Sequence, residues 1–206
     1  MTNSPPLLLH VCCAPCLATA RASAAGHGPD AFAANVGIFF YNPNIHPLME
    51  FRRREKALRV YLERYPLPAE IVSEYGLQTF LERMLSQGKP PASRRDRCAE
   101  CYRLRLGKTA ETARFRGFAA FSTTLLASRE QDRDLLAEIG RETAAKSGLA
   151  FIDADWRKIL PDAATLRGIY KQPYCGCLFS EEERYRDSGK HLYKGSKPLQ
   201  PPGNTR

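Results

Sequence analysis

Short apolar runs and amphipathic stretches alternate along the chain. The apolar runs have the length and the Val, Ile, Leu and Phe content of buried strands. The clearest is LLLHV, which leads directly into a pair of cysteines, and VGIFFY ends at an Asn-Pro-Asn turn. We predict strands at residues 7–11, 36–41, about 71–72, 118–122 and 149–152.

Between these runs, apolar residues recur at helical spacing. In the stretch that begins at residue 48, Phe51, Leu58 and Leu62 lie near one face, and arginines occupy the other faces. Pro66 follows the end of that helix, and Gly148 ends a later one. We predict helices at residues 48–63, 77–85, 98–114 and 130–146, and another that starts near Cys16.

The alternation of strands with helices predicts an α/β fold, in a single domain with a mainly parallel sheet. In such sheets the functional loops lie beyond the carboxyl ends of the strands. The first cysteines follow the first predicted strand and therefore occupy that position. We predict a catalytic α/β domain at residues 1–186. Residues 187–206 are rich in Lys, Pro, Gly and Ser, and we predict that they form a basic, mobile tail.

The composition of the 206 residues is that of a globular protein, with 43% hydrophobic residues. No apolar run is long enough to cross a bilayer, and the first residues lack the basic start of a secretory leader. We therefore expect a cytoplasmic protein with no membrane partner. In that reducing compartment, structural disulfides are disfavoured.

Positive charge is concentrated in one part of the chain. The formal net charge is +9, and the span from Arg52 to Arg116 holds 16 Lys or Arg against 8 Asp or Glu. A basic surface of this kind suits a polyanion such as nucleic acid. A solvated surface without a partner explains the charge equally well, so the charge alone does not decide between them.

All seven cysteines fall into three clusters, and an odd number excludes complete internal pairing. Scattered core cysteines behave as small hydrophobic residues, whereas clustered cysteines in a reducing compartment more often bind metal or carry out redox chemistry. The clusters are Cys12, Cys13 and Cys16, then Cys98 and Cys101, then Cys175 and Cys177.

Each cluster has a spacing that can direct its thiols to one point. In HVCCAPC (10–16) a proline stiffens the turn, and a helix that starts at Cys16 would lower the pKa of its thiol. RCAECYRLR (97–105) places two thiols at i and i+3, on one side of a helical turn and among arginines that favour thiolates. In YKQPYCGCLFS (170–180), Gly176 permits a backbone bend between two thiols.

The number of thiols argues against a purely structural metal site. One zinc site would use four cysteines and leave three, and two zinc sites would need about eight ligands. An iron–sulfur cluster also uses four thiolates, which leaves three for a second metal or a dithiol. The chain has no GxGxxG loop, no P-loop and no HxxxH pair, so nucleotide-dependent chemistry and a histidine metal site are disfavoured.

Five motifs together resemble the cobalamin-independent epoxyqueuosine reductase family, the QueH type. They follow in order from about Leu7 to Tyr185: HVCCAPC, YNPNIHP (41–47), CAECYRLRL (98–106), STTLLAS (122–128) and YKQPYCGCLFS. The resemblance implies an α/β fold similar to the adenine-nucleotide α-hydrolase group. It also implies reduction of epoxyqueuosine to queuosine at the wobble position of tRNA, with a four-iron, four-sulfur (4Fe-4S) cluster beside a second, mononuclear iron.

With those cofactors, the seven thiols divide into four cluster ligands and three others. A strand end and a helix start are rigid elements that can grip one cluster between them. On that ground we predict that the cluster is held by Cys12, Cys13, Cys98 and Cys101. We predict that the second iron is bound by Cys16, Cys175 and Cys177, or that two of these three cycle as a dithiol.

Opening an epoxide needs a proton donor, and a base drawn out of the anticodon needs a surface on which to stack. The candidate proton donors, which the sequence does not rank, are Tyr174, Lys171, Tyr102 and His10. The candidate for receiving the base is Tyr41, and Asn42 beside it is a candidate for binding the substrate or the tRNA. The candidates for binding tRNA phosphates are Arg52, Arg53, Arg54, Arg103 and Arg105.

Two other functions are compatible with the cysteine clusters. A zinc-stabilised RNA-binding module without catalytic activity would be colourless and would hold stoichiometric zinc. A thiol–disulfide oxidoreductase would use Cys98 and Cys101 and would leave the other cysteines idle. A reductase would also need an electron donor, which we expect to be a ferredoxin, a flavodoxin or a chemical reductant.

Overall fold

The computed structural model describes residues 6–24, 35–157 and 159–186, which we call the described residues. The tail predicted at 187–206 lies outside them. The strands are β1 (Leu7–His10), β2 (Val36–Phe40), β3 (Ala69–Ile71), β4 (Ala120–Thr123) and β5 (Ala150–Phe151). The helices are α1 (Ala14–Ala24), α3 (Leu48–Arg64), α4 (Leu77–Met84), α5 (Arg94–Phe115), the 3₁₀ helix η2 (Thr124–Ala127), α6 (Arg133–Ser147) and α7 (Leu178–Tyr185).

The five strands form one sheet in the order β3-β2-β1-β4-β5, and every neighbouring pair is parallel. This confirms the predicted α/β class, in a single domain with a parallel sheet. Strand β1 is central, and its Leu8 and Leu9 are in register with residues of both β2 and β4. Every residue of β2 and of β4 is buried, which is typical of parallel strands that helices cover on both faces.

The strand order reverses between β1 and β4, because the chain crosses from β3 over to the far side of β1 before it forms β4. In open parallel sheets, ligands bind beyond the carboxyl ends of the strands at such a point. Cys12 lies just beyond β1, and Thr124 follows directly after β4. The backbone N–H of Cys12 donates to Oγ1 of Thr124 at 3.1 Å, so the two strand ends meet.

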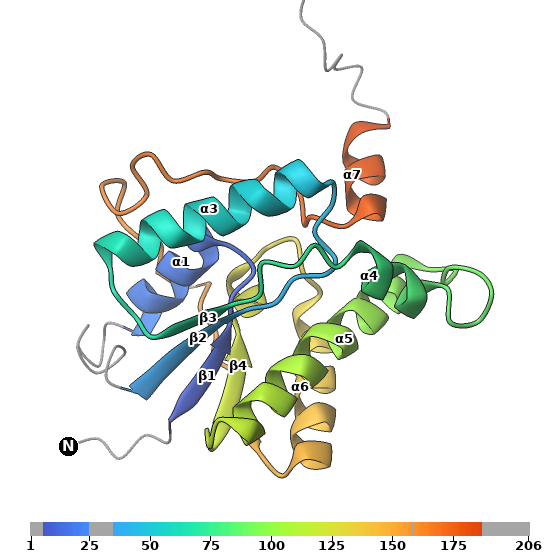
Figure 1. The fold of residues 1–206 in the computed structure, drawn as a ribbon, viewed down its shortest axis with the longest axis horizontal. Coiled ribbons are helices and arrows are strands. Elements are labelled where there is room, and N and C mark those ends of the chain that lie inside the picture. Colours follow the sequence, from blue (N-terminus) through green and yellow to red (C-terminus); the bar gives the residue numbers. More distant parts are fainter. Residues whose placement is uncertain (1–5, 25–34, 158, 187–206) are drawn as a thin grey trace, which may run out of the picture.

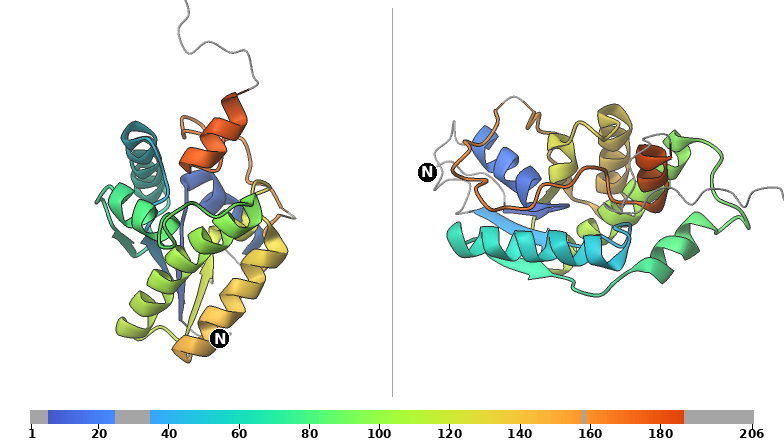
Figure 2. Two further views of the ribbon diagram at one scale, coloured as in Figure 1. Left: turned by 90° about the vertical axis from the view of Figure 1, so that its right-hand side faces the viewer. Right: turned by 90° about the horizontal axis from the view of Figure 1, so that it is seen from above.

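Helices enclose the sheet (Figure 1). In that view α1 and α3 lie to the upper left of the strands, and α5 and α6 lie to their lower right. Helix α5 packs against β1, β4 and α6, while α1 packs against α3 and η2. The left view of Figure 2 shows α7 above the carboxyl ends of the strands. None of the described helices is long and apolar enough to span a membrane.

Two helices near the cysteines differ from the prediction. Helix α5 begins about one turn earlier, because the hydroxyl of Ser93 accepts the backbone N–H of Asp96 and caps the helix. Helix α7 has no counterpart among the predicted helices, because none of its residues is buried and no core-facing stripe marks it. Cys177 is the N-cap of α7, and its thiol accepts the N–H of Ser180 at 3.4 Å.

Candidate metal centre

Three thiols lie together where β1 passes into α1, and we call them the strand-end thiols. Cys12 and Cys13 form the turn after the strand, and Cys16 lies in the first turn of α1. All three are buried, and their Sγ atoms lie within 4.8 Å of one another. The Sγ atoms of Cys12 and Cys13 are 3.7 Å apart. The group is therefore close enough to hold one metal ion.

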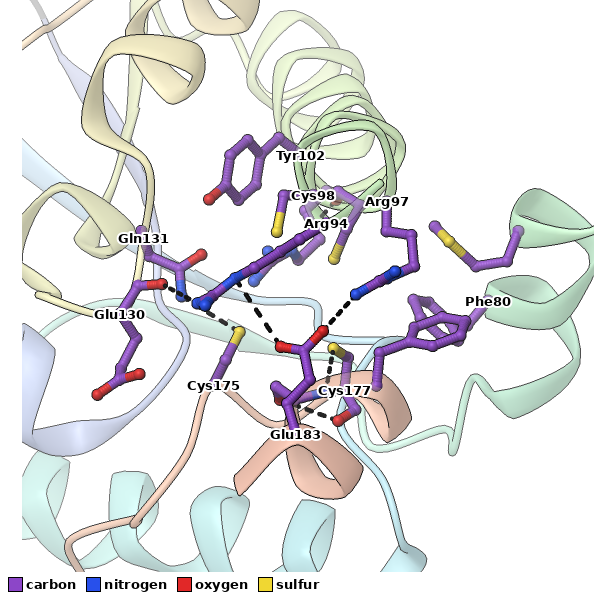
Figure 3. A pocket seen from close by; sticks show the side chains of 15 residues that line it. Phe80, Arg94, Arg97, Cys98, Tyr102, Glu130, Gln131, Cys175, Cys177 and Glu183 are labelled. Carbon is purple, nitrogen blue, oxygen red and sulfur yellow. Dashed lines mark hydrogen bonds and ion pairs between the residues drawn. The ribbon is translucent and has the colours of Figure 1, made fainter. Parts of the chain in front are cut away.

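The other four thiols line a single cavity between α5 and α7 (Figure 3), and we call them the cavity thiols. Cys98 and Cys101 come from the second turn of α5, and Cys175 and Cys177 come from the bend that leads into α7. Aromatic and methionine side chains of α4 and α7 complete the wall of the cavity. Two elements that are distant in the sequence thus bring four thiols to one place.

This grouping departs from the predicted division of the cysteines. Cys16 lies with Cys12 and Cys13, because the first turn of α1 carries it back over the strand end. Cys175 and Cys177 share a cavity with the thiol pair of α5, which the prediction had combined with the strand-end pair. The structure, like the prediction, divides the cysteines into a group of four and a group of three, but the members of the two groups differ. The predicted division is replaced below.

Arg54 fixes the bend that carries two of the cavity thiols. It belongs to α3, is only 2% exposed, and donates to the carbonyl oxygens of Cys175 at 2.8 Å and Tyr174 at 3.0 Å. Its Nε donates to the carboxylate of Glu50 at 2.7 Å, and the hydroxyl of Tyr170 donates to the same carboxylate at 2.6 Å. A buried and paired guanidinium therefore ties the bend to α3.

Gly176 allows the bend to lie against this guanidinium. Its φ is +119°, a backbone conformation that L side chains rarely adopt. A Cβ at this position would also lie 2.9 Å from Nη1 of Arg54. The glycine therefore permits both the direction of the bend and its close approach to α3.

Arg105 is buried in the cavity wall without a carboxylate partner. It is 1% exposed, and its Nε donates to the carbonyl oxygen of Cys101 at 3.3 Å. Its Nη2 has no hydrogen-bond partner, and none of the ion pairs among the described residues involves it. Burial lowers the pKa of Arg105, but the neighbouring groups, first the thiols of Cys101 and Cys175, together raise it above its usual value. The cavity is therefore suited to negative charge on its sulfur atoms.

One thiol in each group has a lowered pKa. Hydrogen bonds with the thiols of Cys13 and Cys16 hold the pKa of Cys12 well below its usual range. A hydrogen bond from the thiol of Cys177 lowers the pKa of Cys175 to about 6. All seven thiols are free. Because the thiolate is the form that binds metal, the lowered pKa of one thiol favours metal binding in each group.

Two glutamine amides donate to the thiols, one in each group. Nε2 of Gln172 lies 2.9 Å from Sγ of Cys13, and Nε2 of Gln131 lies 3.2 Å from Sγ of Cys175. Hydrogen bonds to sulfur are one means by which proteins set the potential of an iron–sulfur centre. Sequence reasoning missed both residues, since Gln131 lies outside the quoted motifs and glutamine has no characteristic spacing to the thiols.

Two predicted proton donors are tyrosines with different surroundings. Tyr102 is buried and lines the cavity, where its hydroxyl accepts the backbone N–H of Asp132 at 3.2 Å. The hydroxyl of Tyr174 donates to the carbonyl oxygen of His46 at 2.7 Å. The hydroxyl of Tyr102 also forms a hydrogen bond with the thiol of Cys98, so its proton lies beside the cavity thiols, whereas the proton of Tyr174 is held by a backbone carbonyl.

The other two predicted proton donors are Lys171 and His10. Lys171 is exposed. His10 has both ring nitrogens engaged, by Oγ1 of Thr123 at 2.8 Å and by the carbonyl oxygen of Tyr41 at 3.0 Å. Burial, and then the charge of Arg105, lower the pKa of His10 to about 4. Through these hydrogen bonds His10 joins the ends of neighbouring strands, so both ring nitrogens are already engaged and it is a weaker candidate for the proton donor.

The arginines predicted to contact tRNA fall into two sets. Arg52, Arg53 and Arg103 are exposed and accessible to a phosphate. Arg54 and Arg105 are buried, and the structure contradicts the prediction for these two, because a buried guanidinium cannot reach the backbone of an RNA outside. Their donors point instead to the groups that surround the thiols.

Tyr41, which we predict to receive the base, and Asn42, which we predict to bind substrate or tRNA, lie just after β2. Tyr41 is half-buried, and its ring stacks on that of Phe39 with 6.0 Å between centroids. Asn42 is buried and donates to the carbonyl oxygen of Val11 at 2.8 Å, while its Oδ1 has no partner. Only Tyr41 therefore offers surface to a base, and Asn42 mainly fixes the backbone beside the strand-end thiols.

Known proteins match this chain over the residues that form both thiol groups. A family model described as epoxyqueuosine reductase QueH matches residues 7–183. The chain belongs to the QueH family. An epoxyqueuosine reductase QueH of Thermotoga maritima is 36% identical over 185 residues, which are 86% of this chain and 91% of the relative. Relatives with the same name from Dehalococcoides mccartyi and Haemophilus influenzae are each 34% identical, over 88% and 89% of this chain and 96% and 73% of the relatives.

The part of the chain that matches the QueH family model includes all seven cysteines. It also includes the two buried arginines, Arg54 and Arg105, and both glutamines that donate to thiols. The match reaches into α7, so the bend with Gly176 belongs to the QueH region. The whole candidate metal centre therefore lies within the part of the chain that defines the family.

Proposed function

We propose that this QueH-family protein reduces epoxyqueuosine to queuosine at the wobble position of tRNA. The observation that carries the proposal is the family match over residues 7–183, which spans two thiol groups at the carboxyl edge of the sheet. The reaction breaks both C–O bonds of the epoxide and leaves an alkene. It consumes two electrons and two protons, and the oxygen leaves as water. The site must therefore hold a redox centre and a proton donor.

We assign the four cavity thiols to a 4Fe-4S cluster and the strand-end thiols to the second, mononuclear iron. Four thiolates are the usual ligands of such a cluster, and the unpaired guanidinium of Arg105 suits its negative charge. Three thiols leave a position on a metal ion for a further ligand. When bound, the cluster supplies electrons singly and the second iron polarises the epoxide oxygen.

The side chains around the thiols orient the site and supply protons. Arg54 holds the bend of the cavity thiols against α3. Tyr102 lines the cavity, and Lys171 precedes Gln172, which contacts a strand-end thiol. We retain Tyr102, which lines the cavity, and the exposed Lys171 as the candidate proton donors. The half-buried ring of Tyr41, just beyond β2, is the candidate surface for the base.

The exposed arginines at the start of α3 are expected to contact tRNA phosphates. Arg52 and Arg53 lie near the carboxyl end of β2, at the edge of the sheet where the thiols lie. Changing both to Glu should weaken tRNA binding and reduce the slope of log K against log salt by roughly 1.4–1.8, which is two phosphate contacts at roughly 0.7–0.9 each. Filter binding over a salt series measures the slope, and the iron content should not change.

Arg114→Glu is the matched control for this change. Arg114 is exposed near the end of α5, which leads towards the amino end of β4 at the opposite edge of the sheet. This variant should leave the salt slope as it is. A tRNA affinity that responds neither to salt nor to the double change at Arg52 and Arg53 would show that the basic face is only a solvated surface.

Metal analysis separates the proposed reductase from the two alternatives. We expect anaerobically purified protein to be brown and to contain iron and sulfide. Colourless protein that holds only zinc after anaerobic reconstitution would favour the RNA-binding module, and colourless protein that exchanges disulfides would favour the thiol–disulfide oxidoreductase. We further propose that this protein is located in the cytoplasm. We propose a ferredoxin, a flavodoxin or a chemical reductant as the electron donor for the reduction.

A further inference from the structure

We infer that Arg105 is a positioning residue whose charge sets the reduction potential of the centre held by the cavity thiols. The inference rests on the proposed cluster at these four thiols. Arg105 acts through the sulfur atoms and not on the substrate, because it is buried in the wall of the cavity. It would make the centre easier to reduce than the same thiols without a neighbouring cation.

Two guanidiniums are buried close to the thiols, and a carboxylate neutralises only one of them. Arg54 pairs with Glu50 at 2.7 Å, and its other nitrogens donate to backbone carbonyls. Within the described ranges Arg105 has no carboxylate in an ion pair, and its Nη2 has no hydrogen-bond partner. A charge that leaves water without compensation costs several kcal/mol. The compensation for Arg105 must therefore come from the contents of the cavity.

The position of Arg105 identifies sulfur as the source of that compensation. Arg105 follows Cys101 by one turn of α5, and its Nε donates to the carbonyl oxygen of that residue at 3.3 Å. It lines the same cavity as all four cavity thiols. Burial lowers the pKa of Arg105, and the thiols of Cys101, Cys175 and, more weakly, Cys12 raise it. The guanidinium therefore lies within electrostatic reach of both thiol groups.

A fixed cation at this place changes the energies of the two redox states by different amounts. Reduction adds one electron, so the reduced centre carries one more negative charge than the oxidised centre. In a buried cavity the attraction to a nearby cation is screened less than in water. Arg105 therefore stabilises the reduced state more than the oxidised state, and its presence raises the reduction potential.

Redox titration of the reconstituted full-length protein, followed by visible and EPR spectroscopy, tests this inference. Arg105→Met should make one-electron reduction at least about tenfold less favourable, which lowers the potential by about 59 mV or more. Arg105→Lys keeps the charge, so its potential should stay closer to that of the unchanged protein than to that of Arg105→Met. Arg103→Met removes an exposed guanidinium on the same helix, paired with Glu100, and should leave the potential as it is.

Every outcome of the titration either supports or overturns the inference about Arg105. A potential of Arg105→Met equal to that of the unchanged protein would overturn the inference, and so would an Arg105→Lys potential as low as that of Arg105→Met. If Arg105→Met does not retain the cluster, the rate of iron loss to a chelator replaces the potential. Arg105→Lys should then hold iron as the unchanged protein does, and equally rapid loss from both variants would overturn the inference. Unchanged protein that forms no iron–sulfur centre would refute the proposed function instead.

Discussion

Cys177→Ala is expected to lose the 4Fe-4S cluster, whereas Cys16→Ala is expected to keep it. Cys177 lines one cavity together with Cys98, Cys101 and Cys175, so its removal takes away one of four cluster ligands. Cys16 belongs to the strand-end thiols, so its removal should weaken binding of the second iron alone. Both variants should lose epoxide reduction. Iron and sulfide analysis, with visible spectra of anaerobically reconstituted protein, measures the difference.

A third variant separates this assignment from the division predicted by the sequence. The sequence-based division places Cys13 with the cluster and Cys177 with the second iron, whereas the structure places each in the other group. Cys13→Ala should therefore retain the sulfide and the visible absorbance of the cluster. If Cys177→Ala keeps the cluster while Cys13→Ala loses it, the structure-based assignment is wrong.

Arg54→Met is expected to lower the free energy of unfolding by about 3–5 kcal/mol, because it leaves a buried charge without its partner. Glu50 is only 4% exposed and would keep only the hydrogen bond from Tyr170. The carbonyl oxygens of Tyr174 and Cys175 would also lose their donor. The bend of the cavity thiols should then loosen and release iron. Denaturant unfolding measures the first effect, and loss of iron to a chelator measures the second.

Arg53→Met is the matched control, because Arg53 is the preceding residue of the same helix and is exposed. It should change the free energy of unfolding by no more than about 0.5 kcal/mol. The double variant Arg54→Met with Glu50→Leu removes both charges and should recover part of the lost stability. A destabilisation by Arg54→Met as small as that by Arg53→Met would contradict the role assigned to the buried pair.

The parallel sheet could be predicted from the sequence, but the grouping of the thiols could not. The apolar runs at 7–11 and 36–41 mark two buried strands, because burial on both faces leaves few polar positions. The spacing of Cys98 and Cys101 indicates a shared side of a helix, but not which distant cysteines face that side. That choice depends on the direction of the bend at Gly176, with its φ of +119°.

The sequence contains evidence that Arg54 and Arg105 are buried, although a count of charges does not reveal it. Arg54 stands in a run of basic residues, which suggests a surface, yet it lies three residues after Phe51 and four before Leu58, on the buried face of α3. Arg105 likewise lies three residues after the buried Tyr102 on α5. Helical spacing therefore predicts that both arginines are buried. Most of their partners come from distant segments of the chain, so those partners can be identified only from the folded structure.

Turnover of a defined tRNA is the most direct test of the central claim. The reconstituted protein is incubated anaerobically with epoxyqueuosine-containing tRNA and a chemical reductant, and the nucleosides released by digestion are analysed by mass spectrometry. We expect epoxyqueuosine to be replaced by a nucleoside that has lost one oxygen atom, and we expect no such product with Cys177→Ala. Epoxyqueuosine that remains unchanged after incubation with protein holding its full iron and sulfide would contradict the assignment of this chain as an epoxyqueuosine reductase.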